Sequence, residues 1–362
     1  MLLADLCLGS SYTMGSQNNR EKQMKEKLVV LGGGSFGTVL ANMIACNNFS
    51  VTLWMRDSKN ARLCETTGSN ERYLPGYELS EDLMISDNLS DCIRDAGVII
   101  FAVPSGSLSE LVGQVIGLID MNVVVISTSK GIYGDNFSLP SQILEQSIPS
   151  ARIGVLSGPN LAKEIACREI TATVVASDDH AVCEILQKVL ASNYFRVYAN
   201  YDRFGVELAG ALKNIYAIVS GIAEALGAGQ NTKSVVLTRG LAEMSRFGQQ
   251  LGADPMTFLG LSGVGDLFVT CSSPLSRNFQ VGLGLGRGKT LAQSMNDVGQ
   301  VAEGVNTTRL VKDKADKMGI YMPIVSALYE TLFNDQSIER SLQIMMSAEQ
   351  NTDVDFMVRQ NE

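Results

Sequence analysis

The chain has 362 residues, of which 45% are hydrophobic, so it is long enough to form two globular domains with sizeable cores. Its 29 basic and 38 acidic residues give a net charge of −9, which argues against a nucleic-acid partner or an anionic membrane surface. The sequence lacks the run of about 18 uninterrupted apolar residues that a membrane helix needs, so we expect no membrane insertion. Any anionic ligand must be held by local groups.

Residues 1–26 differ from the rest of the chain. Met1–Ala4 is apolar, but Asp5 interrupts it and no basic region precedes it, unlike a signal peptide. We expect a disordered N-terminal extension over 1–26 and a flexible tail over 348–362. The seven scattered cysteines include no C-x-x-C pair, which favours a reduced, cytoplasmic protein with small core cysteines and no structural metal.

An apolar run over 27–31 predicts the first buried strand, and a glycine-rich turn follows it directly. Gly32, Gly34 and Gly37 match the G-x-G-x-x-G pattern at the point where a strand would turn into a helix. In that pattern the first glycine permits a tight turn, the second lets the backbone approach a pyrophosphate, and the third allows close helix packing. The turn therefore predicts a dinucleotide site, with an ordinary glycine turn as the alternative.

A second strand over 50–55 completes a β-α-β unit, which favours the dinucleotide interpretation, and it leads into Arg56-Asp57. An NAD-selective site usually places a carboxylate about 20 residues beyond the glycines, where it binds the ribose 2′-OH. Arg56 comes first here, and a guanidinium suits a 2′-phosphate, so the sequence favours NADPH. Asp57 would serve NADH if the strand ended one residue later, which leaves dual use open.

Strand and helix patterns then alternate as far as residue 200, with helical patterns over 107–119 and 181–191. The strand candidates are 83–85, 98–103, 123–127, 153–156, 171–176 and 195–199. This alternation predicts an α/β fold with a Rossmann-type doubly wound sheet over 27–201. Beyond it, helical periodicities at 206–226, 233–251, 303–318 and 323–333 predict an all-helical domain over 202–347.

Proton chemistry has few candidate groups, because the chain contains one histidine, His180, which we expect on the solvated surface. Proton transfer must then fall to lysine, carboxylate, cysteine or tyrosine. Lys213 lies in an otherwise apolar helix whose small neighbours, such as Gly210 and Ala217, leave room around its ammonium. Lys130 follows the strand predicted over 123–127, at the end where open α/β sheets bind ligands. An ordinary solvated lysine is the alternative for each.

Ordered sequence blocks across roughly residues 27–345 resemble the NAD(P)-dependent sn-glycerol-3-phosphate dehydrogenases. The blocks are Gly32 to Gly37, Ser129-Lys130-Gly131, Ser157-Gly158-Pro159-Asn160, Lys213-Asn214, Gly263 to Leu267, Ser276-Arg277-Asn278 and Val301 to Gly304. The resemblance implies reversible hydride transfer between NADPH or NADH and C2 of dihydroxyacetone phosphate. The product would be sn-glycerol 3-phosphate for phospholipid synthesis, and the enzyme would be a homodimer.

The same resemblance implies the catalytic roles. Lys213 would donate a proton to the carbonyl oxygen during reduction and remove it during oxidation, and Lys130 would polarise that oxygen. Asp266 would orient the ammonium, although its glycine-rich setting alone indicates an ordinary turn residue. Burial beside a second cation would lower the pKa of Lys213, and a close Asp266 would oppose that shift.

Substrate and cofactor contacts follow from the resemblance as well. Ser276, Arg277 and Asn278 would bind the substrate phosphate at a helix start, with a helix cap and a solvent-facing arginine as the alternative. Gly158 and Asn160 would line the substrate pocket, although Asn160 replaces the small hydroxyl residue common there. The residues expected at the cofactor are Gly32, Gly34, Ser35, Phe36, Gly37, Arg56, Lys130, Ala162, Arg277, Val301 and Glu303. Glu303 has an alternative as a simple N-terminal helix acid.

Two other functions remain open at this point. A β-hydroxyacid or phosphogluconate-type dehydrogenase would also pair a Rossmann domain with helices and a catalytic lysine. A catalytically idle nucleotide-binding sensor or assembly protein would bind dinucleotide but would leave Lys130, Lys213 and Asp266 apart in space.

Overall fold

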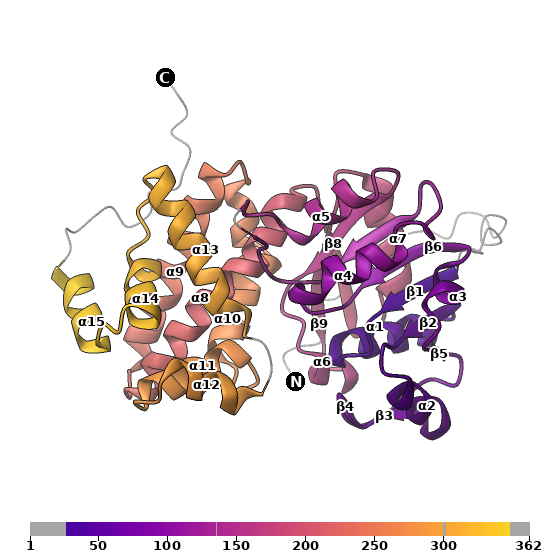
Figure 1. The fold of residues 1–362 in the computed structure, drawn as a ribbon, viewed down its shortest axis with the longest axis horizontal. Helices are drawn as coiled ribbons and strands as arrows, with labels where there is room; N and C mark the ends of the chain where they lie inside the picture. Colours follow the sequence, from indigo (N-terminus) through magenta and orange to yellow (C-terminus); the bar gives the residue numbers. More distant parts are fainter. Residues whose placement is uncertain (1–26, 135, 300–301, 348–362) are drawn as a thin grey trace, which may run out of the picture.

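The computed structural model describes residues 27–134, 136–299 and 302–347. The extension predicted over 1–26 and the tail predicted over 348–362 lie outside these residues. Two bodies lie side by side in Figure 1, a sheet flanked by helices and a bundle of helices. The sheet comes from the N-terminal half of the chain and the bundle from the C-terminal half, so the predicted fold class is confirmed.

An eight-stranded sheet in the order β10-β9-β8-β7-β6-β1-β2-β5 forms the centre of the first body. Its strands are β1 (Lys27–Leu31), β2 (Val51–Trp54), β5 (Met84–Ser86), β6 (Ala96–Phe101), β7 (Val124–Ser127), β8 (Arg152–Ser157), β9 (Thr171–Ala176) and β10 (Phe195–Asn200). In this spatial order, the six neighbouring strands β8, β7, β6, β1, β2 and β5 all pair in parallel. Strand β9 is antiparallel to β8, and β10 is parallel to β9. The six-stranded parallel part has the Rossmann strand order, and β9 and β10 extend it at one edge.

Both faces of the sheet are covered, which explains why its central strands are apolar throughout. On β1, Leu28 and Val30 pack into one core with α1 (Ser35–Cys46) and α7 (His180–Leu190). Alternate residues of the same strand pack into the opposite core with the helices of the other layer. These helices are α3 (Leu89–Ile93), α4 (Ser105–Val115) and α5 (Pro140–Ser147).

Three smaller elements complete the first body. Helix α2 (Ser58–Thr67) and a hairpin of β3 (Ser69–Asn70) with β4 (Leu74–Glu78) lie between β2 and β5 in the chain. Helix α6 (Ala162–Ala166) follows β8. All three were absent from the sequence prediction, because short polar elements carry little hydrophobic periodicity.

The second body is all-helical and is built around one buried helix, α8 (Arg203–Ala225). The others are α9 (Gln230–Gln250), α10 (Asp266–Ser272), α11 (Arg277–Gly286), α12 (Leu291–Val298), α13 (Glu303–Met318), α14 (Pro323–Phe333) and α15 (Ile338–Ser347). Helices α8 and α11 pack backbone against backbone. A Cβ at Gly221 would lie 2.1 Å from the Phe279 carbonyl oxygen, and one at Gly282 would lie 2.0 Å from that of Ile218.

Helix α8 is the one helix in the described part of the chain that is long and apolar enough to cross a membrane. However, 89% of its most apolar window is buried inside the protein. Its apolar side chains therefore form the centre of the helical domain.

The single histidine is on the surface, and the described cysteines are divided between the core and the surface. His180 is exposed, as predicted, and stacks on Tyr201 with ring centroids 3.8 Å apart. The cysteines buried as predicted are Cys64, Cys92, Cys183 and Cys271. The prediction of small core cysteines is wrong for Cys46 and Cys167, which are exposed because they stand at the C-terminal ends of α1 and α6.

Candidate active site

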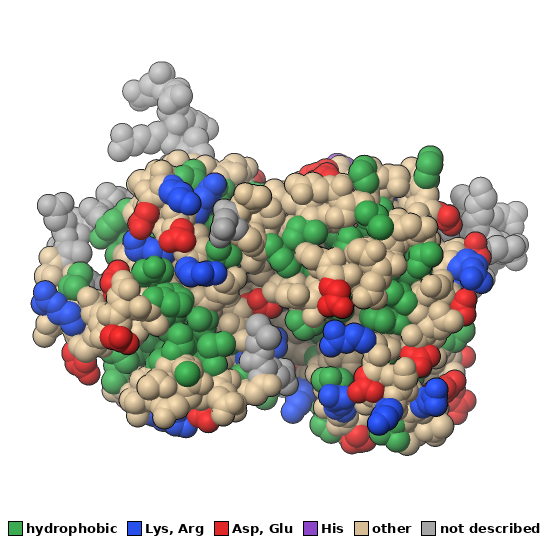
Figure 2. Space-filling model, viewed as in Figure 1, with side chains coloured by type: hydrophobic (Ala, Val, Ile, Leu, Met, Phe, Trp, Pro, Cys, Tyr) green, Lys and Arg blue, Asp and Glu red, His purple; other side chains and the backbone are tan. Residues whose placement is uncertain are grey.

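Two glutamates of the helical domain join it to the sheet domain. Glu207 on α8 accepts hydrogen bonds from the amide and hydroxyl of Ser141, in the first turn of α5. Glu303, the first residue of α13, accepts hydrogen bonds from the amide and hydroxyl of Ser105, the first residue of α4, at 3.3 and 2.5 Å. Each carboxylate caps a helix of the other domain. Figure 2 shows the surface hollowed along this junction.

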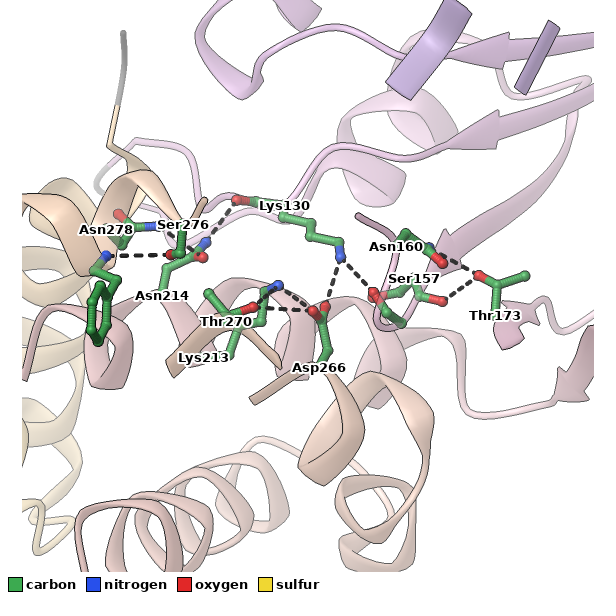
Figure 3. Close-up of polar contacts among 12 residues, drawn as sticks. Lys130, Ser157, Asn160, Thr173, Lys213, Asn214, Asp266, Thr270, Ser276 and Asn278 are labelled. Atoms are coloured by element: carbon green, nitrogen blue, oxygen red, sulfur yellow. Dashed lines mark hydrogen bonds and ion pairs between the residues drawn. The ribbon is translucent and has the colours of Figure 1, made fainter. Parts of the chain in front are cut away.

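Three predicted catalytic residues meet in this junction (Figure 3). The Asp266 carboxylate lies between two ammonium groups. One of its oxygens pairs with Lys130 Nζ at 2.6 Å, and the other pairs with Lys213 Nζ. Asp266 is 1% exposed, so the two lysines share a counterion inside the protein. This arrangement excludes the alternative in which the three residues lie apart.

Lys213 is buried, at 6% exposure, within the apolar helix α8. Its Nζ also donates to Thr270 Oγ1 at 2.6 Å. Burial lowers the pKa of Lys213 to about 8, because desolvation disfavours the ammonium. The Asp266 carboxylate opposes this fall, and the nearby Lys130 ammonium adds to it. Lys213 can therefore both donate and accept a proton near neutral pH.

Local backbone geometry positions the two partners of Lys213. Asp266 is the first residue of α10 and follows a π-helical turn over Leu261–Gly265. Within that turn a Cβ at Gly263 would lie 2.0 Å from the Phe258 carbonyl oxygen, so the close approach requires glycine. Lys130 leaves the carboxyl end of β7, and Ser129 fixes the segment by donating to the Val103 carbonyl oxygen at 2.7 Å.

The loop after β8 forms the wall beside Lys130. Gly158 has a φ of +124°, which favours glycine, and its carbonyl oxygen accepts a hydrogen bond from Lys130 Nζ at 3.0 Å. Asn160 Nδ2 donates to Thr173 Oγ1 at 3.0 Å. Asn160 Oδ1 and Ser157 Oγ are buried and have no hydrogen-bond partner among the described residues. An unpaired buried polar atom is costly, so these two oxygens mark the loop as polar at its centre.

The predicted phosphate triplet starts α11, as the sequence indicated. Ser276 Oγ accepts from the Phe279 amide at 3.3 Å, so this serine is the helix cap that the alternative described. Asn278 joins two helices, because its Nδ2 donates to Asn214 Oδ1 at 3.0 Å and its Oδ1 accepts from the Gly304 amide at 2.9 Å. Arg277, which lies between Ser276 and Asn278 in the chain, is exposed.

The glycine turn has the geometry that its pattern predicted. Gly32 has a φ of +124°, and a Cβ there would lie 2.4 Å from the Ala102 carbonyl oxygen. A Cβ on Gly37 would lie 2.0 Å from the Gly32 carbonyl oxygen, so this glycine lets α1 pack onto the turn. Gly34 has open space at its Cβ position and precedes α1. The turn lines a cavity of about 390 Å³, which also reaches Arg56.

The other expected cofactor residues lie in several places. Ser35 starts α1 and donates to the Tyr73 carbonyl oxygen, and Phe36 and Ala162 pack against the core beneath the turn. Glu303 lies at the domain junction, with its carboxylate capping α4. Val301 lies outside the described residues.

Asp57, the alternative ligand for a ribose hydroxyl, is already engaged. It caps α2 by accepting from the amides of Lys59 and Asn60, and it pairs with Arg72 at 2.7 Å. The hydrogen bond from the Asn60 amide lowers the pKa of Asp57 most strongly. Arg56 is exposed and lines the cavity at the glycine turn.

Sequence reasoning assigned no role to two polar residues of the junction. Thr270 lies one helical turn after Asp266 on α10 and contacts both Asp266 and Lys213. Asn214 donates to the Lys130 carbonyl oxygen at 3.5 Å. The spacing of four residues between Asp266 and Thr270 was a usable signal, but it required knowing that a helix starts at Asp266. Among the residues that the structure describes, no cluster of three or more His, Cys, Asp or Glu side chains could hold a metal ion.

Comparison with known proteins gives a consistent family. The model of the NAD-dependent glycerol-3-phosphate dehydrogenase N-terminus matches residues 27–183, and that of the C-terminus matches residues 202–343. The chain is 53% identical over 330 residues to a glycerol-3-phosphate dehydrogenase [NAD(P)+] of Teredinibacter turnerae, covering 91% of this chain and 97% of the relative. The corresponding enzyme of Saccharophagus degradans is 50% identical over 343 residues, covering 94% and 96%.

Solved structures agree with these matches. The crystal structure of glycerol-3-phosphate dehydrogenase from Coxiella burnetii superimposes with a TM-score of 0.84 at 34% identity, covering 90% of this chain and 99% of that chain. Two family models, close relatives and a similar solved structure thus point to one assignment. The chain belongs to the NAD-dependent glycerol-3-phosphate dehydrogenase family.

Proposed function

We propose that this protein is an NAD(P)-dependent sn-glycerol-3-phosphate dehydrogenase. It reversibly reduces C2 of dihydroxyacetone phosphate and supplies sn-glycerol 3-phosphate for glycerophospholipid synthesis. The observation that carries the proposal is the buried Asp266 carboxylate paired with both Lys130 and Lys213 at the domain junction. An aspartate that holds two lysines together in this way gives the chain an acid and base without histidine.

Lys213 is the general acid and base. In reduction its ammonium donates a proton to the carbonyl oxygen as hydride reaches C2, giving the secondary alcohol and a neutral amine. In oxidation the neutral amine accepts the hydroxyl proton. Lys130 polarises the same oxygen, while Asp266 orients both ammonium groups. A pKa of about 8 for Lys213 suits both directions.

The glycine turn and the cavity beside it fit a dinucleotide. A Cβ would meet no atom within 4 Å at Gly34, so a pyrophosphate could approach this backbone at the start of α1. When bound, the nicotinamide supplies or accepts the hydride. Gly32, Gly34, Ser35, Phe36, Gly37, Arg56, Lys130, Ala162, Arg277, Val301 and Glu303 are the residues we assign to this cofactor. Arg56 at the cavity supports a preference for NADPH over NADH.

The substrate contacts come from both sides of the junction. Ser276, Arg277 and Asn278 would bind the phosphate at the start of α11. Gly158 and Asn160 would face the three-carbon chain, and the unpaired Asn160 Oδ1 would accept the C1 hydroxyl of dihydroxyacetone phosphate. Burial of Lys213, Asp266, Ser276 and Asn278 would exclude water from the reacting centre.

Several broader features belong to the same proposal. Residues 27–201 would bind the cofactor, and residues 202–347 would bind the substrate and form a homodimer in the cytoplasm. Exposed apolar side chains support the dimer, because helices α9 and α15 present Val235, Leu342 and Met346 to the surface. Hydrophobic side chains also gather on the helical body in Figure 2. Sedimentation of the purified protein at twice the monomer mass is the expected result.

An NAD(P)H oxidation assay tests the activity directly. Purified protein is mixed with NADPH or NADH and one substrate at a time, and absorbance of the reduced nicotinamide is followed. We expect oxidation with dihydroxyacetone phosphate and faster oxidation of NADPH than of NADH at equal concentration. Turnover with a β-keto acid but not with dihydroxyacetone phosphate would favour the hydroxyacid dehydrogenase alternative. Nucleotide binding without turnover of either would contradict the proposed dehydrogenase activity.

A further inference from the structure

We propose that Arg72, on the β3–β4 hairpin, is a specificity residue that binds the 2′-phosphate of NADPH together with Arg56. We further propose that Asp57 holds the Arg72 guanidinium until the phosphate replaces it. The inference rests on the proposed function for its cofactor. It assigns a role to a segment between the second and third strands of the sheet, to which the sequence analysis gave none.

The hairpin is fixed to the glycine turn by a set of hydrogen bonds. Asn70 is fully buried, and its Nδ2 donates to the Gly33 carbonyl oxygen at 3.0 Å and to Thr38 Oγ1 at 2.8 Å. From the turn itself, Ser35 Oγ donates to the carbonyl oxygen of Tyr73 at 2.5 Å. The same residues that shape the dinucleotide turn therefore determine where the hairpin lies.

These contacts place Arg72 on the wall of the cavity. The cavity of about 390 Å³ is lined by Arg56 and Arg72 as well as by Gly32, Gly33 and Gly34. Arg72 Nη1 pairs with Asp57 Oδ2 at 2.7 Å, and its guanidinium carbon lies 5.1 Å from the centre of the Tyr73 ring. The carboxylate and the ring together hold an otherwise flexible side chain at the cavity edge.

The charges indicate which ligand group this corner takes. The cavity is lined by two guanidinium groups and by two carboxylates, those of Asp57 and Glu110, and the Asp57 carboxylate is satisfied by the amides of α2 as well as by Arg72. A phosphate carries more negative charge than a ribose hydroxyl and offers three acceptor oxygens to the guanidinium forks. It can therefore replace Asp57 as the partner of Arg72, whereas a hydroxyl cannot. The pair also lies beside Arg56, in the position where dinucleotide sites distinguish the two cofactors.

Binding measurements without turnover test this assignment. Calorimetry compares adenosine 2′,5′-bisphosphate with ADP as ligands of the wild type and of Arg72→Gln, Arg62→Gln and Asp57→Asn. Arg62 is a matched control, because it is exposed on α2 and does not line the cavity. Asn replaces Asp57 because it also caps helices well, so α2 keeps its N-terminal hydrogen bonds.

We expect Arg72→Gln to weaken the bisphosphate by about tenfold to a hundredfold, the effect of losing a charged hydrogen bond, with ADP affinity within about twofold. Arg62→Gln should leave both affinities at the wild-type value. Asp57→Asn should strengthen bisphosphate binding, because it removes a competing and repelling charge. Equal weakening of both ligands by Arg72→Gln, or weaker bisphosphate binding in Asp57→Asn, would overturn the proposal.

Failure of this inference is distinguishable from failure of the proposed function. If the wild type binds adenosine 2′,5′-bisphosphate and ADP equally well, the 2′-phosphate site is overturned. The proposed dehydrogenase activity would still hold if the protein reduces dihydroxyacetone phosphate with NADH. Conversely, the expected binding pattern without turnover would support the 2′-phosphate site and contradict the dehydrogenase activity.

Discussion

Replacing Asp266 by Asn should move the pH dependence of catalysis, because this carboxylate holds the proton on Lys213. The substitution keeps the size of the side chain and removes its charge. Lys213 then has no counterion and still faces the Lys130 ammonium, which Asp266 pairs with at 2.6 Å. Both changes disfavour a second positive charge at Lys213, so its pKa must fall.

The size of the shift follows from the geometry. Two unit charges about 4 Å apart interact by about 4 kcal/mol at an effective dielectric constant of about 20, equal to about three pKa units. Lys213 starts from a pKa of about 8. We therefore expect about 5 to 6 in the Asp266→Asn variant, since relaxation and water entry reduce the full Coulomb effect. At neutral pH the variant would hold a neutral amine, which cannot protonate the ketone.

The assay is kcat/KM for glycerol 3-phosphate oxidation between about pH 5 and pH 10, because this parameter titrates the free enzyme. Wild-type oxidation should rise with pH through a midpoint near 8, and the Asp266→Asn profile should rise about two units lower. Reduction at neutral pH should fall in the same variant. Asp313→Asn, an exposed substitution on α13, is the matched control. An unchanged midpoint in a folded Asp266→Asn protein would refute the electrostatic reasoning.

Three further outcomes follow from the same structure. Lys130→Met should move the oxidation midpoint upward, because a cation that lowers the pKa of Lys213 is removed; a downward move in the pH profile would contradict this. Arg277→Gln should raise KM for dihydroxyacetone phosphate about tenfold or more with a smaller effect on kcat, and an unchanged KM would remove Arg277 from the phosphate site. Burial raises the pKa of Glu207 to about 7 from 4.5, so its neutral form favours folding, and this contribution declines as pH rises between those values. In urea titrations over this pH range, the wild type should therefore lose up to about 3 kcal/mol of unfolding free energy that Glu207→Gln retains. An equal loss in the two proteins would contradict the raised pKa of Glu207.

The fold was predictable wherever burial imposes a period on the sequence. Strand β1 and helix α8 are apolar because both are enclosed, and that apolarity located them to within a few residues. The β3–β4 hairpin was not predictable in the same way. Its key residue, Asn70, is buried through polar contacts with the glycine turn, and such contacts leave no hydrophobic pattern.

The site was predictable as a set of residue types and not as a network. Lys213 stood out as a charge in an apolar helix and Lys130 as a lysine at the carboxyl end of a strand, and family resemblance added Asp266. The contact of Thr270 with both Lys213 and Asp266 depends on the start of α10 after a π-helical turn, which no short motif specifies. Similarly, the capping of α4 by Glu303 joins residues that are 198 positions apart. Long-range pairings of this kind depend on how the two domains dock.

The most direct test of the central claim is the rate at which Lys213→Ala reduces dihydroxyacetone phosphate with bound NADPH in a single turnover. The account predicts a rate lower by about 10²- to 10⁴-fold, the usual contribution of a positioned acid, with NADPH affinity near the wild-type value. Lys317→Ala, an exposed substitution on α13, should react at the wild-type rate. A wild-type rate in Lys213→Ala would contradict the claim that this buried amine moves the proton.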